Sequence, residues 1–413
     1  MEDNSKTTGY KVSIRTLIVI IILFSTSFLP AKYFSPVIVF CGIVVLFFSR
    51  GIIQYGLIKF IFPLLIVFTT GILGAFKNEA FHVYRDISYA LTPLALMITG
   101  YWLAENRKMH AGFFKILIIG GVFIASIHVA KFIMEPGLLG EVIARIRAKA
   151  INPNIDLVTI ALILVIIRKK IGLKTYKMEY LTKYFLLPML IVSFILSYSR
   201  TYLVVFIVML AAVSGLIGRI NLKVFLVFMI SVITILVIII TAPKDDAVTF
   251  RGKIARSLRE LKVKEYSNFR DINLNWRGYE TKKAIETYNS GTLLKKMFGQ
   301  GFGALVDLKM EMELAGEKFT KIPILHNGYA YILVKTGIAG IICYLLFYFL
   351  IISRAVSKPS NDKDKQTTIF RRLLLGTTLS LLLTMIVIGG MAEVHNSEFV
   401  LMTGFLLHLT ERG

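Results

Sequence analysis

The chain has 413 residues, of which 56% are hydrophobic and only 18% are charged, and its formal net charge is +23. Soluble domains carry about 25% charged residues, so the composition argues against an ordinary soluble protein. Aromatic residues make up 12% of the chain, which excludes a disordered basic tail. The basic residues lie between apolar runs rather than on one patterned face, which argues against a nucleic-acid binder. The composition therefore predicts a protein that crosses a membrane several times and carries its charge in loops.

About 12 segments are apolar and long enough to predict membrane-spanning helices, which need about 20 residues each. The segments are 16–30, 36–49, 55–75, 87–104, 112–133, 155–167, 184–198, 201–218, 224–241, 324–353, 373–389 and 397–410. The first follows Lys11 and Arg15 as a signal peptide would, but no small-residue cleavage site follows Pro30, so we expect it to remain as a span. Cys41 and Cys343 lie inside apolar runs and predict neither a disulfide framework nor a zinc site.

The distribution of Lys and Arg predicts the orientation of these spans. Segments 168–183 and 354–372 hold six basic residues each, and a cytoplasmic N-terminus places both of them inside, together with the C-terminus. The chain then divides into a membrane bundle of about nine spans (1–241), a large outer loop (242–323) and a bundle of about three spans (324–413). The loop holds 16 basic and 11 acidic residues, and its apolar spacing is partly helical. It predicts an active-site lid or a substrate platform, and a folded spacer is the alternative.

The sequence SYSRT, at 197–201, joins two spans with almost no loop and places Arg200 at the membrane boundary. Its guanidinium points into headgroups or into a cavity, and an ordinary arginine that reaches from the boundary to water is the alternative. Ser197, Ser199 and Thr201 could hydrogen-bond a phosphate or cap the following helix.

A second arginine, Arg277, lies in the large loop in the sequence NWRGYE. The stretch FGQGFG follows it, and its glycines stand at alternate positions: Gly299, Gly301 and Gly303. Backbone amides in such a stretch can approach an anion closely. A glycine-rich turn between helices explains the stretch equally well.

A third basic cluster comes before the sixth span, which opens with the sequence INPN at 151–154. Proline near a helix start is a normal arrangement. Arg145, Arg147 and Lys149 lie just upstream and could contact anionic lipid headgroups or a pyrophosphate.

The stretch LHNGYAYILVKTGIAG, at 325–340, places His326 and then Asn327 where the large loop enters the tenth span. Helical geometry predicts a stripe of mainly small residues on the same face as the histidine, which would let another helix pack closely. The stripe consists of Ala330, Leu333, Gly337 and Gly340. Lys335 falls on the opposite face and is a candidate because it is ionisable inside a span. His326 is either a functional base or a satisfied interfacial histidine, and His395 in the last outer loop is its rival for the base role.

These features, in this order, resemble the O-antigen ligase and O-antigen polymerase superfamily over roughly residues 150–345. The carrying features are the NPN opening, SYSR, Arg277 followed by FGQGFG, and HNGYAYILVKTGIAG. The resemblance implies an all-α, GT-C-like integral membrane glycosyltransferase of the bacterial inner membrane, with a large, partly helical periplasmic loop and a periplasmic active site. It also implies an undecaprenyl-diphosphate-linked glycan as donor, a lipid or glycan acceptor, and no metal or other cofactor.

In that family the residues that match Arg200, Arg277 and His326 are the functional ones. The guanidinium groups would bind the diphosphate without a metal and neutralise the charge that develops on it. His326 would be the general base that deprotonates the acceptor hydroxyl in a single, inverting displacement. The further predicted contacts to diphosphate or substrate are Arg145, Arg147, Asn327, Gly299, Gly301 and Gly303.

Ligase and polymerase stay open as alternatives, because ligase members often place an acidic residue after the His-Asn pair and this chain reads GYAYILVK. A lipid-linked oligosaccharide flippase or another polytopic transporter is the alternative from a different class, although transporters usually show paired halves. A structural partner in a wall-synthesis complex is a third. We expect contacts with membrane lipids and with other polysaccharide-assembly proteins, and none with nucleic acid.

Overall fold

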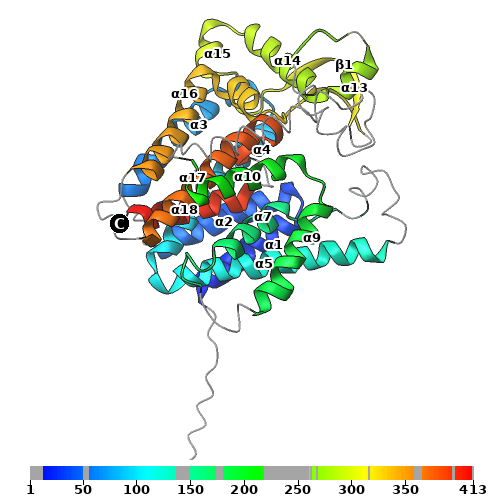
Figure 1. Cartoon of the computed structure of the whole chain (residues 1–413). Coiled ribbons are helices and arrows are strands. Elements are labelled where there is room, and N and C mark those ends of the chain that lie inside the picture. Colours follow the sequence, from blue (N-terminus) through cyan, green and yellow to red (C-terminus); the bar gives the residue numbers. More distant parts are fainter. Residues whose placement is uncertain are drawn as a thin grey trace, which may run out of the picture.

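The computed structural model describes residues 13–49, 55–135, 149, 151–173, 180–217, 260, 263–266, 268–314, 317–357, 365–392 and 396–411. Within these ranges a bundle of apolar helices carries a smaller polar module at one end (Figure 1). The predicted span 224–241 and the candidates Arg145, Arg147 and His395 lie outside the described residues.

Every other predicted span coincides with a helix of the bundle. These helices are α1 (Ile14–Phe28), α2 (Ala31–Phe48), α3 (Tyr55–Leu73), α4 (Ala80–Glu105), α5 (Arg107–Met134), α7 (Ile155–Ile167), α9 (Leu187–Leu196), α10 (Arg200–Ser214), α16 (Gly328–Val356), α17 (Lys365–Ile388) and α18 (Ser397–Glu411). Short turns of other helix types lie at Ala75–Lys77, Thr182–Leu186 and Gly390–Ala392. Within the described part of the chain, α3 with the turn after it, α4, α5, α16 and α17 are long and apolar enough to cross a membrane.

Helix α18 lies in the centre of the bundle, packed on α4 and α17, and its side chains are buried on every face. A helix that is hydrophobic all round must be enclosed by others. Glycines permit the contact with α4, because a Cβ at Gly100 would collide with the backbone of Leu401, and one at Gly404 with that of Met97. Small residues let helix backbones approach closely, and such close packing holds helices together in lipid, where the hydrophobic effect does not drive their association.

The polar module, called here the hairpin module, consists of α13 (Phe269–Leu274), α14 (Trp276–Asn289), α15 (Leu293–Phe298), β1 (Val306–Leu314) and β2 (Glu317–Ile322). Its strands form an antiparallel pair in which Val306 faces Ile322 and Met312 faces Phe319. The module has a small hydrophobic core of its own, which Leu325 extends toward α16.

The described part of the chain is mainly helical, as predicted, and α14 and α15 fit the partly helical character expected of the loop, whereas the short hairpin of β1 and β2 was not predicted. The sequence VDLKMEMEL alternates apolar and polar residues, which is the period of a strand with one buried face. Val306, Leu308 and Met312 are buried accordingly. The predicted helical spacing covers only part of the loop, and this alternation had not been interpreted as a strand.

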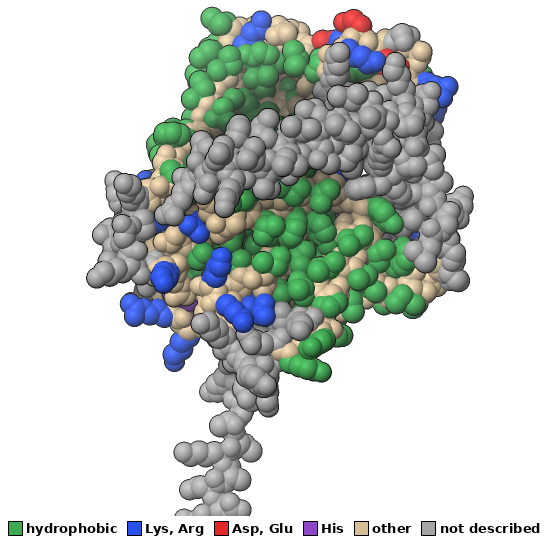
Figure 2. Space-filling model, viewed as in Figure 1, with side chains coloured by type: hydrophobic (Ala, Val, Ile, Leu, Met, Phe, Trp, Pro, Cys, Tyr) green, Lys and Arg blue, Asp and Glu red, His purple; other side chains and the backbone are tan. Residues whose placement is uncertain are grey.

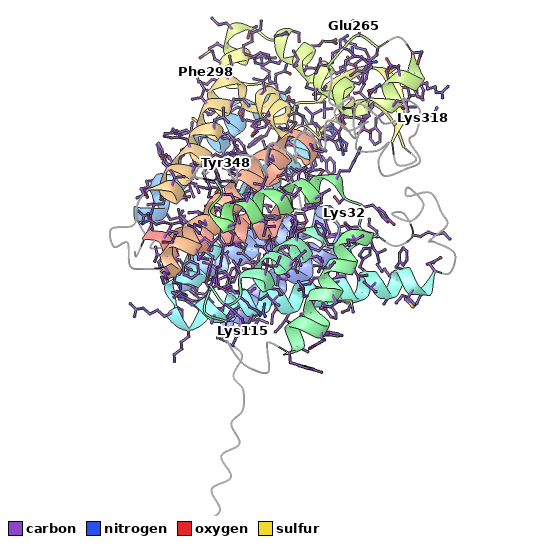
Figure 3. All side chains as sticks on the ribbon, viewed as in Figure 1. Lys32, Lys115, Glu265, Phe298, Lys318 and Tyr348 are labelled. Atoms are coloured by element: carbon purple, nitrogen blue, oxygen red, sulfur yellow. The ribbon has the colours of Figure 1, made fainter. Side chains whose placement is uncertain are left out.

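Charged groups gather at the two ends of the molecule. Figure 2 shows hydrophobic side chains over the bundle, Lys and Arg at the end near the C-terminus, and charges of both signs on the hairpin module. Figure 3 places Lys115 at the bundle and Glu265 and Lys318 on the module. An apolar belt flanked by charge is the distribution typical of a membrane-spanning bundle.

The glycine-rich stretch packs against α16 and interrupts it. Gly337 has a φ of 67° and a ψ of −164°, so the helix is broken at that residue. The backbone amides of Gln300 and Gly301 donate to the carbonyls of Val334 and Lys335, at 2.8 and 2.9 Å. The glycine-rich stretch therefore donates hydrogen bonds to the carbonyls that lose their helical partners at the break. Only a glycine adopts the backbone angles of position 337 without strain.

This break corrects the predicted stripe of small residues below His326. Regular helical geometry holds only as far as Gly337, so Gly340 is not in register with His326. Gly337 instead faces α15, since a Cβ on it would collide with the carbonyl of Met297. The small residue serves the contact with the module rather than with another spanning helix.

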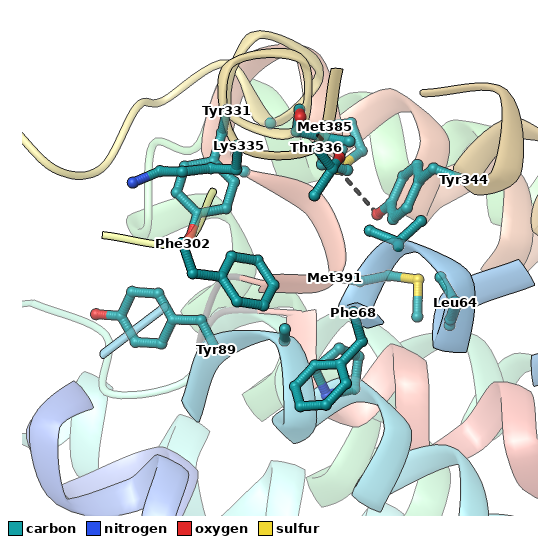
Figure 4. Close-up of a pocket in the computed structure, with 16 residues that line it drawn as sticks. Leu64, Phe68, Tyr89, Phe302, Tyr331, Lys335, Thr336, Tyr344, Met385 and Met391 are labelled. Carbon is teal, nitrogen blue, oxygen red and sulfur yellow. Dashed lines mark hydrogen bonds between the residues drawn. The ribbon is translucent and has the colours of Figure 1, made fainter. Parts of the chain in front are cut away.

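Lys335 joins α16 to α4 and to the glycine-rich stretch. Its Nζ lies 2.6 Å from Oδ2 of Asp86 and also donates to the carbonyl of Ala304. The amide of Gly303 donates to the same Asp86 oxygen at 2.7 Å. Figure 4 shows Lys335 beside a small cavity of about 60 Å³, into which Phe302 projects. Lys335 thus has a structural partner away from His326.

Candidate active site

Helices α7, α10 and α16 all begin with polar caps taken from the sequence motifs. Asn154 accepts from the amide of Leu157 at 3.0 Å, and Ser199 accepts from that of Tyr202 at 3.5 Å. Asn327 accepts from two amides in the first turn of α16, at 3.1 and 3.2 Å. Capping side chains replace the missing intrahelical partners, and each helix N-terminus carries partial positive charge. The side-chain oxygen of Asn327, a predicted substrate contact, is therefore used as a cap.

Arg200 is the first residue of α10, and the turn that positions it is as short as predicted. Helix α9 ends at Leu196, and only three residues separate it from Arg200. Tyr198, in that turn, has a φ of 45°, a left-handed conformation that is uncommon for a residue other than glycine. Such conformations persist only where the surrounding structure enforces them, and they gather at functional sites.

Arg200 and Arg277 come together at one carboxylate. Arg200 Nη2 lies 3.6 Å, and Arg277 Nη1 3.5 Å, from the same oxygen, Oε2 of Glu260. The side chains are 23%, 26% and 17% exposed respectively, so the cluster is partly shielded from solvent. The structure thus brings together the two arginines that the sequence predicts as diphosphate ligands. The sequence did not indicate Glu260.

A cavity of about 190 Å³, called here the anion cavity, lies beside these arginines. Its polar wall is formed by the start of α10, with Ser197, Ser199, Arg200 and Thr201, and by Arg277. The other lining residues are Ile151, Asn152, Ile155, Tyr202 and Ile388. Hydroxyls, two guanidinium groups and helix N-termini around one space favour an anion with several oxygens.

His326 is held by a buried carboxylate. Its Nδ1 lies 2.8 Å from Oε2 of Glu280, and its backbone amide donates to the same oxygen at 3.4 Å. The Glu280 side chain is 4% exposed and that of His326 is 49% exposed. An ionised carboxylate only accepts hydrogen bonds, so Nδ1 carries the proton and Nε2 becomes the basic nitrogen of the ring. This arrangement is the one that orients a histidine for general-base chemistry.

Glu280 lies in the NWRGYE motif but was not among the predicted site residues. Glu280 follows Arg277 by three residues on α14, and residues at that spacing share a helix face. The sequence therefore places a carboxylate on the same helix face as a candidate arginine, and this spacing could have marked Glu280 as a candidate site residue. Its contact with a histidine 46 residues away is not visible in the sequence.

A second cavity of about 560 Å³, called here the dyad cavity, opens beside His326 and Glu280. Arg277 and Ile388 line this cavity and the anion cavity alike. The remaining lining residues are Trp276, Phe319, Ile322, Pro323, Ile324 and Leu325. The arginine pair and the histidine–glutamate dyad therefore face two adjoining spaces that share the side chain of Arg277.

The three glycines predicted to cradle an anion have other partners. The amide of Gly299 donates to the carbonyl of Lys295, that of Gly301 to the carbonyl of Lys335, and that of Gly303 to Asp86, at 2.8, 2.9 and 2.7 Å. Their φ values of 83°, 84° and 85° let the stretch lie against neighbouring backbone. The prediction finds no support in this geometry, because each amide is already satisfied within the chain.

Two tyrosines, Tyr279 in the core of the hairpin module and Tyr266 packed against that core, have altered acidity. Burial, and secondarily the nearby Asp271 carboxylate, raise the pKa of Tyr266 to about 12. Burial also raises the pKa of Tyr279, whose hydroxyl donates to the carbonyl of Leu308 at 2.5 Å. Both tyrosines therefore stay neutral well above neutral pH and stabilise the wall that carries Arg277 and Glu280.

Among the residues that the structure describes, no three His, Cys, Asp or Glu side chains gather where they could hold a metal ion. The groups that converge at the two cavities are instead cations and a histidine–carboxylate pair.

Comparison with known families bears on this arrangement. Residues 185–345 match the family model described as O-antigen ligase, which confirms the predicted resemblance over that segment. The matched segment contains Arg200, Arg277, Glu280 and His326. No curated protein matches the chain. The match shows that this segment is similar to O-antigen ligases, and the long apolar helices indicate a protein that crosses a membrane several times.

Proposed function

Since residues 185–345 match the O-antigen ligase family, we propose that the chain is a glycosyltransferase that moves a glycan from undecaprenyl diphosphate to an acceptor hydroxyl. The observation that carries the proposal is the position of Arg277, which lines both the anion cavity and the dyad cavity. A group that departs beside the arginines would thus leave next to the space in which His326 can activate a nucleophile.

On the donor side, Arg200 and Arg277 would bind the diphosphate. The carboxylate of Glu260 now lies within 3.6 Å of both, so the site accommodates negative charge between them. Guanidinium groups bind phosphate oxygens in pairs, and they stabilise the charge that grows on the leaving group. The hydroxyls of Ser199 and Thr201 at the start of α10 would supply further donors for the same oxygens, whereas the hydroxyl of Ser197 donates to the carbonyl of Phe194 at 2.7 Å.

On the acceptor side, Nε2 of His326 would take the proton of the attacking hydroxyl. The hydroxyl oxygen forms a bond to the anomeric carbon as the bond from that carbon to the diphosphate oxygen breaks. The electron pair leaves with undecaprenyl diphosphate, and the proton stays on the imidazole until water removes it. Glu280 would hold the ring in the required tautomer and stabilise its protonated form. A single displacement of this kind inverts the anomeric centre.

We place this chemistry at the periplasmic face of a bacterial inner membrane. In this arrangement the chain has about 12 spans, both termini are cytoplasmic, and the hairpin module belongs to the outer loop of a GT-C-like fold. Ligase and polymerase share the donor and differ in the acceptor, a lipid anchor or a second lipid-linked glycan. The site described here serves either.

The test uses the full chain in proteoliposomes with a lipid-linked glycan extracted from the host. We expect His326→Ala to lower the transfer rate by about 10²–10⁴-fold. Arg200→Ala and Arg277→Ala should each lower it by about 10²–10³-fold. The matched controls are Arg270→Ala and His82→Ala, because these residues lie outside both cavities, and they should transfer at the normal rate.

Two results would contradict the proposal. Full transfer by His326→Ala would remove the histidine from the mechanism. Movement of intact lipid-linked glycan across the bilayer, with no transfer to an acceptor, would identify a flippase instead.

A further inference from the structure

The dyad cavity has a wall chemistry unlike that of the anion cavity. Its charged groups are Arg277 and Glu280, on α14, and His326, just before α16. The rest of the wall is apolar and includes the rings of Trp276 and Phe319. With about 560 Å³, it lies within the range of about 300–1,000 Å³ that ligand pockets occupy.

The two rings come from different elements of the hairpin module. Trp276 is the first residue of α14, immediately before Arg277, and its ring lies 6.0 Å from that of Tyr279. Phe319 lies on β2, where it pairs with Met312 of β1. Neither ring is fully buried, so both retain surface that a ligand can cover.

This combination suits a saccharide better than a phosphate or a lipid tail. The face of an aromatic ring carries negative charge density and its partners are positively polarised edges, such as the C–H groups on one face of a sugar ring. The hydroxyls at the rim of the same sugar need charged or polar partners, which Arg277, Glu280 and His326 provide. A polyprenyl chain would displace water from these three groups and offer them no hydrogen bond in return, and the desolvation of polar groups is costly.

We propose that the dyad cavity is the acceptor-saccharide subsite, in which Trp276 and Phe319 hold a sugar ring and present its hydroxyl to His326. This assignment rests on the proposed function, and it names the site and the chemical class of the second substrate. Donor and acceptor then meet at Arg277, the side chain that the two cavities share.

The fluorescence of Trp276 can report the binding of a sugar, because the chain contains only two tryptophans. The other, Trp102, is buried in α4 with the guanidinium of Arg15 4.2 Å above its ring. Trp102→Phe therefore makes Trp276 the single indole of the full chain. The variant is reconstituted in nanodiscs, and the fluorescence of Trp276 is measured as a glycan is added. Two glycans serve as probes: that of the host's lipid-linked pool and that of its surface lipid. Each is released from its lipid by mild acid before use.

We expect a saturable change in Trp276 fluorescence with at least one of these glycans. A response to the glycan of the lipid-linked pool indicates a polymerase acceptor, and a response to the surface-lipid glycan indicates a ligase acceptor. Phe319→Ala in the same background should raise the Kd by about 3- to 10-fold, the worth of one aromatic contact. Phe298→Ala removes an exposed ring outside the cavity and should leave the Kd unchanged.

A kinetic measurement separates the subsite from the rest of the mechanism. Trp276→Ala should raise the acceptor KM by about tenfold and leave the donor KM unchanged. The subsite is overturned if neither glycan alters the fluorescence of a protein that still transfers, or if undecaprenyl phosphate alone alters it. Failure of the proposed function would give a different result: the wild-type protein would be folded normally but would transfer no glycan at all.

Discussion

The imidazole of His326 and the carboxylate of Glu280 lie 2.8 Å apart, although the two residues are 46 positions apart along the chain. The carboxylate is almost fully buried, whereas the ring is half exposed toward the dyad cavity. The pair thus combines a fixed anchor inside the hairpin module with a reactive group at its surface. Each half lies on a different element, so the dyad exists only when α14 packs against the entry of α16.

We predict that Glu280→Gln lowers kcat because the ring loses the charge that fixes its tautomer and stabilises its protonated form. The loss should approach, but not exceed, that of His326→Ala, about 10²–10⁴-fold. Rates from reconstituted protein measure it. If Glu280 acts through His326, the double variant is no slower than His326→Ala alone. Multiplying losses would show that Glu280 acts elsewhere.

Glu260→Gln should strengthen the binding of pyrophosphate. The glutamate carboxylate is an anion within 3.6 Å of both arginines and competes with the diphosphate for them. Removing its charge should lower the Kd several-fold, and the gain should shrink at high salt because the groups are only partly shielded. Calorimetry at two salt concentrations measures both effects. Weaker binding would mean that Glu260 chiefly holds the arginines in place.

Asn327→Ala should lower the free energy of unfolding by about 1 kcal/mol, because the first turn of α16 loses its cap. Asn327→Asp keeps an oxygen in that position, and it should retain both stability and transfer. Thermal unfolding in detergent and the transfer assay together check this prediction. A stable Asn327→Asp variant without activity would restore the predicted substrate contact through the side-chain amide.

Lys335→Ala and Asp86→Ala should each destabilise the fold strongly, by about 3–5 kcal/mol, because each breaks a buried ion pair. Lys335→Ala leaves Asp86 with its longer contact to Arg85, at 3.5 Å, and Asp86→Ala removes the carboxylate that compensates the charge of Lys335. The Lys335 and Asp86 side chains are 2% and 0% exposed. The double variant should be less unstable than the sum of the two. The exposed pair Lys318–Glu311 is the matched control, and its removal should have no measurable effect on the unfolding temperature. Additive losses at positions 86 and 335 would contradict a direct pairing.

The raised pKa of Tyr266 predicts a pH effect in the alkaline range. The phenol ionises near its ordinary value of 10.0 in the unfolded chain, and at about 12 in the folded one. Its contribution to stability is therefore complete below pH 10, and it is lost as the pH rises toward 12. The ultraviolet absorbance of tyrosinate follows this ionisation. Tyr266→Phe should remove one tyrosine from the late-ionising part of the titration, and a titration identical to that of the wild type would contradict the assignment.

Much of the bundle could be predicted because a spanning helix is a local property of the sequence. An apolar run of sufficient length must satisfy its own backbone in lipid, and a helix does so without help from distant residues. The predicted spans that fall on described residues match the helices of the bundle for that reason, although individual ends shift by several residues. The hairpin of β1 and β2 was missed, since strand pairing depends on a partner that local spacing does not reveal.

For the site, the sequence alone identified two arginines and one histidine as candidates. Arg200 lies at a turn with no room for a loop, Arg277 lies in the large loop, and His326 lies at a helix entry. Only the tertiary structure decided their partners. In the folded chain both arginines contact Glu260, and His326 hydrogen-bonds the carboxylate of Glu280. The amides of the glycine-rich stretch hydrogen-bond backbone carbonyls and the carboxylate of Asp86. These contacts connect residues far apart in the chain, and their distances are set by the packing of whole helices, which no local pattern encodes.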